Sequence, residues 1–492
     1  MISLVRNATW SGLSAAIRAT TGLFIALLAV RLLGAEHYGR MSTLLSLFIL
    51  FLTLNSSIFT VLVTRLMGAE VLECEKKHAD VLSASTILAL ASIIVLNSLV
   101  LLIYAFVPNI FSFSANENLF LLDIQRAFLA MGLLTSLQIM TALYSAVIES
   151  LGRLDLAMKW LLIGPLFVMA VLFLLLVLHV PITVLSYIAI LCCGALIDLS
   201  MLVLVRRKLL PTPISLILPR EQWWQIWSLL KSGTTLQAAS LMTLFLEPMN
   251  KFLLNHFAGS LAVTAYDLAM KIIWGIQSLF GAAMRVFLHL SGEQGQVVGR
   301  AFSRVFTLIL VPVLAAHVLA AVFLTWVIHY WVTIGDMHLF MLFFGIATLS
   351  NLGMIYVTPM YISLISRGDF HFIFRSQAIV AVTNVIGSVA LIPIFGLPGA
   401  AFGLLCATVY NVAAIYLRHE RTVGQSGGLL PIFKNSVGRY ALTFFLLIVA
   451  ILIGGMSDVG GTSQLLILFF TAYLIKGEEI VSMMLHRIRA TK

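Results

Sequence analysis

The sequence predicts an all-α polytopic membrane protein of about fourteen transmembrane helices. Hydrophobic residues make up 61% of the chain and its mean hydropathy is +1.06, whereas soluble domains contain roughly 45–50% apolar residues. Apolar stretches close to the ~20 residues that span a bilayer recur from one end of the chain to the other. Basic residues gather in alternate connections between these stretches, which is the pattern of a membrane protein with a fixed orientation.

The expected spans follow one another through short connections, and twelve spans is the alternative count. The first apolar run contains Arg18 and lacks a small-residue cleavage site, so we expect it to remain as a helix. Because the connections are too short to fold as domains, the activity is expected inside the membrane. The expected spans cover residues 11–33, 41–63, 80–107, 119–148, 156–179, 182–205, 232–254, 262–290, 303–331, 338–365, 371–394, 398–417, 437–455 and 463–485.

The basic loops predict the orientation, since cytoplasmic loops carry an excess of Lys and Arg. On this map both termini and the even-numbered connections are cytoplasmic, and these connections include Lys76-Lys77 and Arg206-Arg207-Lys208. The net charge of +10 therefore reflects the basic residues of the cytoplasmic connections. No soluble basic module exists that would bind nucleic acid. The four cysteines show neither disulfide nor metal-ligand spacing.

A central linker divides the chain into two lobes. The linker, residues 206–231, contains a Trp-rich segment that predicts a short interfacial helix on the cytoplasmic surface. We expect an N-terminal lobe of helices 1–6 over residues 1–205 and a C-terminal lobe of helices 7–12 over residues 232–418. Residues 419–492 are expected to form two additional C-terminal helices.

The two lobes show a faint internal repeat. Residues 142–148 resemble residues 359–365, and both segments end the fourth span of their lobe. Gly34 ends the first span, and Gly259 follows the seventh. Because each lobe has an even number of spans, the copies share one orientation and are related by an axis along the membrane normal.

The span expected over residues 262–290 carries a polar stripe along one line of its helix. The stripe rises about 27 Å between Asp267 and Arg285, which is most of the membrane. Charges in hydrocarbon cost at least roughly a few kcal/mol, so they mark a solute pathway by default. We interpret the stripe as cavity lining, and a polar seam between helices is the alternative. Its members are Asp267, Lys271, Trp274, Ser278, Gly281, Arg285 and His289.

The preceding span, expected over residues 232–254, adds a second charged pair. Glu247 and Lys251 are four residues apart, as are Asp267 and Lys271, so each pair can form within one helix or exchange partners across the hairpin. A proline between the first two residues is expected to bend the helix. The charges form either a static ion-pair cluster or a proton-sensitive gate. The candidate gating or coupling residues are Glu247, Lys251 and Asp267.

Two intramembrane arginines, Arg18 and Arg285, have no acidic neighbour three or four residues away in the sequence. Arginine stays protonated and offers a bidentate fork, so a diphosphate is a natural counter-charge. Arg18, Lys271 and Arg285 are therefore the candidate diphosphate-binding residues. For Arg18, snorkelling to the cytoplasmic headgroups is the alternative. The candidate sugar contacts, each of which could equally hold helices together, are Trp274, Asn351 and Tyr361.

Three stretches of the chain resemble a known family. They follow the first span, cover spans seven and eight, and join spans eleven and twelve. They are similar to the polysaccharide transporters of the multidrug/oligosaccharidyl-lipid/polysaccharide exporter superfamily, the Wzx-type O-antigen flippases. The stretches are Arg31-Leu32-Leu33-Gly34-Ala35-Glu36-His37-Tyr38-Gly39, Glu247-Pro248-Met249-Asn250-Lys251 with Tyr266-Asp267-Leu268-Ala269-Met270-Lys271, and Ile392-Pro393-Ile394-Phe395-Gly396-Leu397-Pro398-Gly399-Ala400-Ala401.

This resemblance implies two six-helix lobes around a central cavity, with two extra C-terminal helices. It also implies a secondary-type flippase, not an enzyme, without a cofactor or metal. Such a protein moves undecaprenyl-diphosphate-linked oligosaccharide from the cytoplasmic to the periplasmic leaflet of the bacterial inner membrane by alternating access. The expected partners are this lipid-linked substrate, membrane lipids, a polysaccharide polymerase and a chain-length regulator.

Three other functions stay open. A multidrug cation antiporter of the same superfamily would need a cavity dominated by carboxylates, whereas intramembrane bases slightly outnumber acids here. A lipid II flippase would share the fourteen spans and the cationic cavity. A polytopic glycan polymerase or glycosyltransferase would need a sizeable outer loop, and the longest outer connection, about residues 108–118, has no basic residue and no acid pair.

Overall fold

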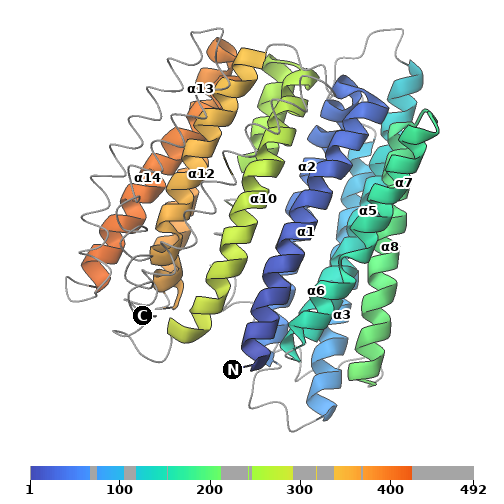
Figure 1. The fold of residues 1–492 in the computed structure, drawn as a ribbon, viewed down its shortest axis with the longest axis vertical. Coiled ribbons are helices and arrows are strands. Elements are labelled where there is room, and N and C mark those ends of the chain that lie inside the picture. Colours follow the sequence, from blue (N-terminus) through green and yellow to red (C-terminus); the bar gives the residue numbers. More distant parts are fainter. Residues whose placement is uncertain are drawn as a thin grey trace, which may run out of the picture. The chain divides into compact units, whose positions relative to one another are not determined.

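The computed structural model contains α helices and no strands over the residues that it describes (Figure 1). Seven helices in these ranges are long and apolar enough to cross a membrane. The chain is therefore a multi-pass membrane protein, as its composition predicts. The structure describes residues 2–66, 75–104, 118–151, 153–211, 242, 246–291, 317, 337–366 and 369–423.

The first of two compact units comprises Met1–Leu268 with Phe370–Val382. In this unit α5 packs against α2, α3 and α8. Phe48 of α2 meets Phe128 of α5 edge to face, with ring centroids 5.1 Å apart. The helices of the unit begin with α1 (Ile2–Leu33), α2 (Ala35–Leu66), α3 (Glu75–Tyr104), α5 (Asn118–Ser150), α6 (Leu154–Trp160), α7 (Ile163–Val177) and α8 (Val184–Leu209), and continue with a helix over residues 246–257.

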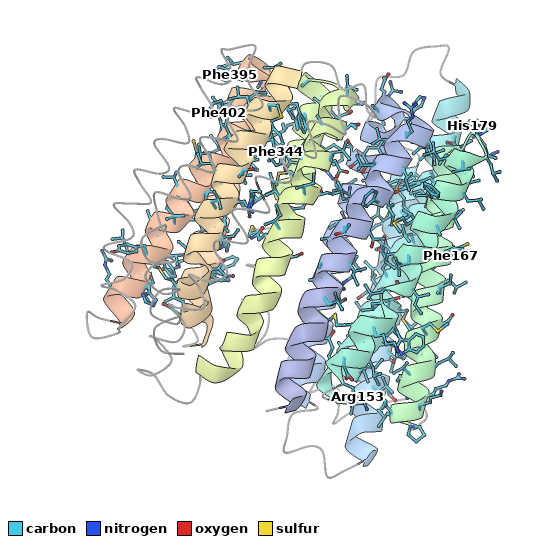
Figure 2. The ribbon with its side chains drawn as sticks, viewed as in Figure 1. Arg153, Phe167, His179, Phe344, Phe395 and Phe402 are labelled. Atoms are coloured by element: carbon cyan, nitrogen blue, oxygen red, sulfur yellow. The ribbon has the colours of Figure 1, made fainter. Side chains whose placement is uncertain are left out.

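The second unit comprises Ala269–Asp369 with Thr383–Lys492. In this unit α12 packs along α14. At the turn between α13 and α14, the rings of Phe395 and Phe402 lie 5.9 Å apart between centroids (Figure 2). Two helices, α10 and α13, belong partly to each unit. The helices concerned are α10 (Ser260–Ser291), α12 (Met337–Ser366), α13 (Phe370–Phe395) and α14 (Leu397–Val423).

Most of the expected spans coincide with helices, although the helix ends differ from the ends of the apolar runs. The span expected over residues 371–394, for example, is α13. Five expectations lie wholly or largely outside the described residues: the interfacial helix of the linker, the first part of the span over 232–254, the spans over 437–455 and 463–485, and the span over 303–331 apart from His317. The total of fourteen spans and the two predicted lobes stay predictions.

The span expected over residues 156–179 is not one continuous helix. Instead α6 ends at Trp160 and α7 begins at Ile163, with a turn at Leu161 and Leu162 between them. Pro165 accounts for the break, because proline has no N–H to donate to the carbonyl of Leu161 and its ring clashes with that carbonyl. This break lies inside an apolar segment, where backbone groups need partners from other helices.

Two glycines occupy equivalent places in the two halves of the chain. Gly34 separates α1 from α2 with a φ of +86°, and Gly259 precedes α10 with a φ of +83°. A left-handed residue that ends a helix is usually glycine, because a Cβ disfavours this conformation. The faint repeat in the sequence therefore has a structural counterpart in two hairpins with the same turn.

Candidate functional site

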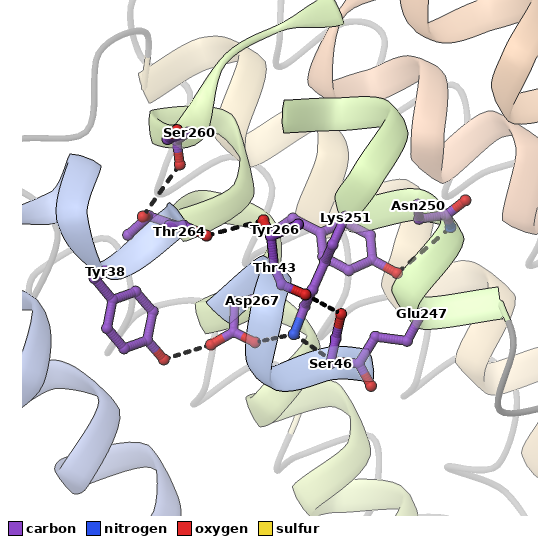
Figure 3. Close-up of polar contacts among 11 residues, drawn as sticks. Tyr38, Thr43, Ser46, Glu247, Asn250, Lys251, Ser260, Thr264, Tyr266 and Asp267 are labelled. Carbon is purple, nitrogen blue, oxygen red and sulfur yellow. Dashed lines mark hydrogen bonds and ion pairs between the residues drawn. The ribbon is translucent and has the colours of Figure 1, made fainter. Parts of the chain in front are cut away.

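A buried charged cluster lies in the first unit, where α2, α10 and the helix over residues 246–257 meet (Figure 3). The Lys251 ammonium lies 2.5 Å from the Glu247 carboxylate and 2.6 Å from that of Asp267. The Tyr38 hydroxyl donates to the second oxygen of Asp267. The side chains of Lys251, Asp267 and Glu247 are only 2%, 3% and 12% exposed. We call these four residues the Lys251 cluster.

The local sequence explains how the Lys251 cluster forms. Glu247 and Lys251 are one helical turn apart, so they pair along one face of their helix. The left-handed Gly259 reverses the chain into α10, which brings Asp267 against Lys251 from the other arm of the hairpin. Both modes of pairing that the sequence allowed, within a helix and across the hairpin, therefore occur at Lys251.

The electrostatics of the Lys251 cluster depend on the lysine. An isolated buried ammonium pays a large desolvation cost, and two carboxylates at hydrogen-bond distance offset it. The same ammonium separates the carboxylates of Glu247 and Asp267, which would otherwise repel each other in a medium of low dielectric constant. The cluster is therefore strongly coupled, and a change in one member alters the environment of the others.

The first turns of α2 and α10 cross in direct backbone contact beside this cluster. Thr264 donates its hydroxyl to the carbonyl of Ala35. A Cβ on Gly39 would lie only 1.9 Å from the carbonyl oxygen of Ser260. If the Gly34 and Gly259 turns are superposed, Ala35 matches Ser260 and Gly39 matches Thr264, so each contact is the counterpart of the other. The two contacts are thus related by an approximate two-fold symmetry between the turns at Gly34 and Gly259.

Arg18 lies in a different part of the first unit, beside the break between α6 and α7. Its Nη2 points to the Met158 sulfur at 3.1 Å, and Ser14 donates to the Met158 carbonyl at 3.4 Å. The Gly164 N–H donates to the Asp198 carboxylate at 2.8 Å. Arg18 and Asp198 thus each contact the broken segment, one from α1 and the other from α8.

The other predicted residues lie on α10 and α12. Lys271 is half-buried on α10, Trp274 is exposed on the same helix, and Tyr361 is half-buried on α12. Asn351 is buried, and its amide nitrogen lies 3.3 Å from the Ile273 carbonyl and 3.0 Å from the His317 ring. These are contacts between segments, which is the alternative that the sequence left open for Asn351. Arg285 lies in α10, and its side chain is outside the described residues.

Sequence reasoning alone missed two members of these sites. Tyr38 occurs in the stretch that resembles the flippase family, but nothing in its spacing connects it to Asp267. Asp198 is the lone acid of its span, and its contact with the Gly164 N–H depends on how α7 and α8 pack. Long-range contacts of this kind leave no periodic signal in one sequence.

Comparisons with known proteins find solved structures with a similar fold. No protein-family model matches the sequence, and no curated protein matches it. Solved structures do match: an inward-facing multidrug resistance MATE family transporter of the MOP superfamily has a TM-score of 0.64 at 14% identity, over 85% of this chain and 99% of that one. A MATE structure in the bent conformation reaches 0.58 at 13% identity, over 85% of this chain and 95% of that one.

The lipid II flippase MurJ, in an inward closed conformation, has a TM-score of 0.56 at 13% identity. That match covers 98% of this chain and 100% of the flippase. The chain has the fold of these transporters. The identities are low, so the shared feature is the fold. This agrees with the coarse part of what the resemblance implied, an all-α multi-pass membrane protein.

Proposed function

We propose that this protein is a flippase that moves undecaprenyl-diphosphate-linked oligosaccharide, an O-antigen or exopolysaccharide repeat unit, between the leaflets of the bacterial inner membrane. The observation that carries the proposal is the match with the lipid II flippase, which covers 98% of this chain, whereas the MATE matches cover 85%. A flippase of this kind needs cationic groups within the membrane to hold a diphosphate. Arg18, on α1, supplies one such group.

In this proposal the diphosphate is held by Arg18, Lys271 and Arg285, and Trp274, Asn351 and Tyr361 contact the sugars. The lipid tail stays in the bilayer while the protein alternates between cytoplasmic and periplasmic openings, with both termini in the cytoplasm. No covalent step is required. A polysaccharide polymerase and a chain-length regulator would act on the translocated unit.

The Lys251 cluster is proposed as the gate of this cycle. The cluster joins α10 to α2 at the crossing where Gly39 touches Ser260, so opening this crossing requires the Tyr38 contact with Asp267 to break. The charges of Glu247, Lys251 and Asp267 can then change partners. A static ion-pair cluster is the alternative. A variant that removes both charges of a pair would then regain both its abundance and its export, whereas the same variant of a gate would regain abundance but not export.

The direct test in cells is the fate of lipid-linked glycans in a deletion strain. We expect intact lipid-linked repeat units to accumulate on the cytoplasmic leaflet, and a plasmid copy of the gene to reverse the accumulation. Lipid-linked glycans that lack sugars would instead indicate a glycosyltransferase. Accumulation of lipid II with loss of viability would indicate the lipid II flippase.

A multidrug antiporter is the second candidate, because a MATE structure has the higher TM-score, 0.64 against 0.56. That function predicts unaltered surface glycan in the deletion strain together with sensitivity to cationic drugs. The two measurements on one pair of strains, glycan display and drug tolerance, therefore separate the candidates.

A further inference from the structure

A buried histidine that the proposed transport cycle does not use lies next to Asn351. His317 is 1% exposed. Its Nε2 lies 3.0 Å from the amide nitrogen of Asn351 on α12, and the same nitrogen lies 3.3 Å from the carbonyl oxygen of Ile273 on α10. One amide group therefore joins His317, α12 and α10 in the interior of the second unit.

The contact with Ile273 decides which way the Asn351 amide faces. If the amide were turned over, its oxygen would face the Ile273 carbonyl oxygen, and two acceptors would meet without a hydrogen. The amide nitrogen therefore faces Ile273, and its second hydrogen serves Nε2 of His317. Because this ring nitrogen has to accept, a neutral His317 carries its proton on Nδ1. An imidazolium could not make this bond, because both of its ring nitrogens donate.

The bond to the Ile273 carbonyl is an addition to α10. A carbonyl inside an α helix already accepts from the N–H four residues later, and its second lone pair is available to another donor. Ile273 lies well inside α10, which is continuous here, and its side chain is buried. Asn351 therefore does not replace a lost helical bond. It ties α10 to α12 in the middle of the helix.

α12 gives this tie a fixed support. A Cβ on Gly353, two residues after Asn351, would lie 3.0 Å from Cγ2 of Thr408 on α14. Asn411 of α14 donates its amide to the sulfur of Met354 at 3.1 Å. α12 is thus packed closely on α14 just beyond Asn351, so the amide is held from that side.

The tie sets the rotation of α10 about its own axis. With 3.6 residues per turn, Trp274 lies roughly 100° around the helix from Ile273, and Lys271 lies roughly 200° from it. Accordingly Ile273 is buried, whereas Lys271 is half-buried and Trp274 is exposed. The directions of the proposed diphosphate and sugar contacts on α10 are therefore set at the point that Asn351 holds.

We propose that His317 is a positioning residue of the substrate site. It orients the Asn351 amide, and through the Ile273 carbonyl this pair holds Lys271 and Trp274 in place for the substrate. The proposal rests on the proposed function, because it assumes that Lys271 binds the diphosphate. It also limits what Asn351 offers to a sugar: its nitrogen is committed to Ile273 and His317, so a sugar hydroxyl can only donate to its oxygen.

The test is a binding titration of purified, detergent-solubilised protein with inorganic pyrophosphate. This probe has no sugar, so it reports the position of Lys271 and not a sugar contact of Asn351. His317→Leu removes the acceptor and should weaken pyrophosphate binding at least about threefold, within the range that one hydrogen bond typically contributes. Asn351→Leu should have the same effect. His317→Gln keeps an acceptor and should bind nearly as the wild type does.

Two controls separate positioning from a general loss of stability. Lys271→Ala should weaken pyrophosphate binding, and adding His317→Leu should weaken it no further, because the histidine acts through the lysine. Asn97→Leu is the matched control for the asparagine. The Asn97 amide also serves two acceptors, the Ile93 carbonyl at 2.8 Å and the Ser136 hydroxyl on α5 at 2.9 Å, but in the first unit. Its variant should bind pyrophosphate as the wild type does.

The outcomes separate this inference from the proposed function. If Lys271→Ala weakens binding while His317→Leu and Asn351→Leu do not, the positioning role is overturned and the diphosphate role of Lys271 stands. If the wild type does not bind pyrophosphate, or if Lys271→Ala binds it equally well, both are overturned. A further loss in the double variant, or an equal loss in Asn97→Leu, would also reject the inference, since it would reflect a general effect on the fold.

A second measurement on the wild type does not depend on how the leucine variants fold. Solid-state NMR of protein with isotopically labelled histidine reports which ring nitrogen carries the proton, and the signal that His317→Gln removes belongs to His317. The proton should lie on Nδ1, with Nε2 as the acceptor. A signal from the tautomer with the proton on Nε2, or from an imidazolium, would contradict the inference.

Discussion

Lys251 shows how one buried charge organises its neighbourhood. It is 2% exposed and pairs with two carboxylates, one from its own helix and one from α10. Tyr38 adds a neutral donor to Asp267 from α2. Three helical segments thus meet in this cluster. The sequence predicted three of the four residues as a group, because the spacing of four within a helix and the hairpin are visible in it. Tyr38 was not predicted, because its contact spans 229 residues.

Replacing Lys251 with Met should destabilise the protein more than any other single change in this cluster. The variant leaves two carboxylates facing each other without a cation, and breaking a buried pair costs about 3–5 kcal/mol. The thermal midpoint in detergent should fall clearly. Adding Glu247→Gln leaves only the carboxylate of Asp267, which keeps its bond from Tyr38, and should recover part of the loss. A Lys251→Met variant as stable as wild type would show that the ion pairs contribute little.

The arginine variants test the diphosphate role. Arg18→Lys keeps the positive charge, so we expect near-normal abundance in the membrane, but a point charge replaces a fork and glycan export should fall. Arg285→Ala should also lower export. Quantitative immunoblots and surface-glycan staining measure the two properties. Normal export in Arg18→Ala, in Arg285→Ala and in the double alanine variant would reject the role.

The helices and their breaks are predictable from the sequence to different degrees. Apolar runs of span length locate the helices well, because a bilayer requires about 20 apolar residues and satisfies no backbone groups. The break at Leu161 and Leu162 was missed, since Pro165 is a single residue in a continuous apolar run. The break is tolerated because Ser14 and Asp198 supply partners from α1 and α8, and these are contacts that helix periodicity does not show.

The crossing of α2 and α10 makes a prediction for glycine variants. Gly39→Ala would place a Cβ 1.9 Å from the Ser260 carbonyl oxygen, so the crossing has to separate. Overpacking of this kind costs about 1–3 kcal/mol, and the thermal midpoint should fall.

Gly22→Ala is the matched control for that variant. Gly22 lies within α1, and a Cβ there meets no atom within 4 Å. Alanine favours a helix over glycine by about 1 kcal/mol, so this variant should be neutral or slightly more stable. Equal midpoints for the two variants would show that the crossing is loose.

The whole molecule has a fold that it shares with known transporters, and it carries basic residues within its membrane spans. The fold is shared with MATE transporters and with a lipid II flippase at identities of 13–14%. The predicted all-α, multi-pass membrane fold is confirmed at this level, because the hydropathy of the sequence locates the spans. The transported substrate is not determined by the fold, since function depends on the groups that line the site. It was predicted from the resemblance and from Arg18, Lys271 and Arg285.

The basic loops predict that the central linker is cytoplasmic. In a variant without native cysteines, a membrane-impermeant thiol reagent added to intact cells should not label Glu221→Cys. Ser114→Cys, in the connection expected outside, is the control and should be labelled. Efficient labelling of the cysteine at position 221 would overturn the orientation.

The most direct measurement of the proposed activity is translocation in liposomes that contain only the purified protein. A polyprenyl-diphosphate-linked oligosaccharide is placed in both leaflets, and an impermeant glycosidase is added outside. Without translocation, the enzyme reaches about half of the substrate, whereas the wild type should make nearly all of it accessible over time. An inactive protein with Arg18 and Arg285 both replaced by Ala should behave like empty liposomes. A plateau at half cleavage with active wild-type protein would contradict the flippase function.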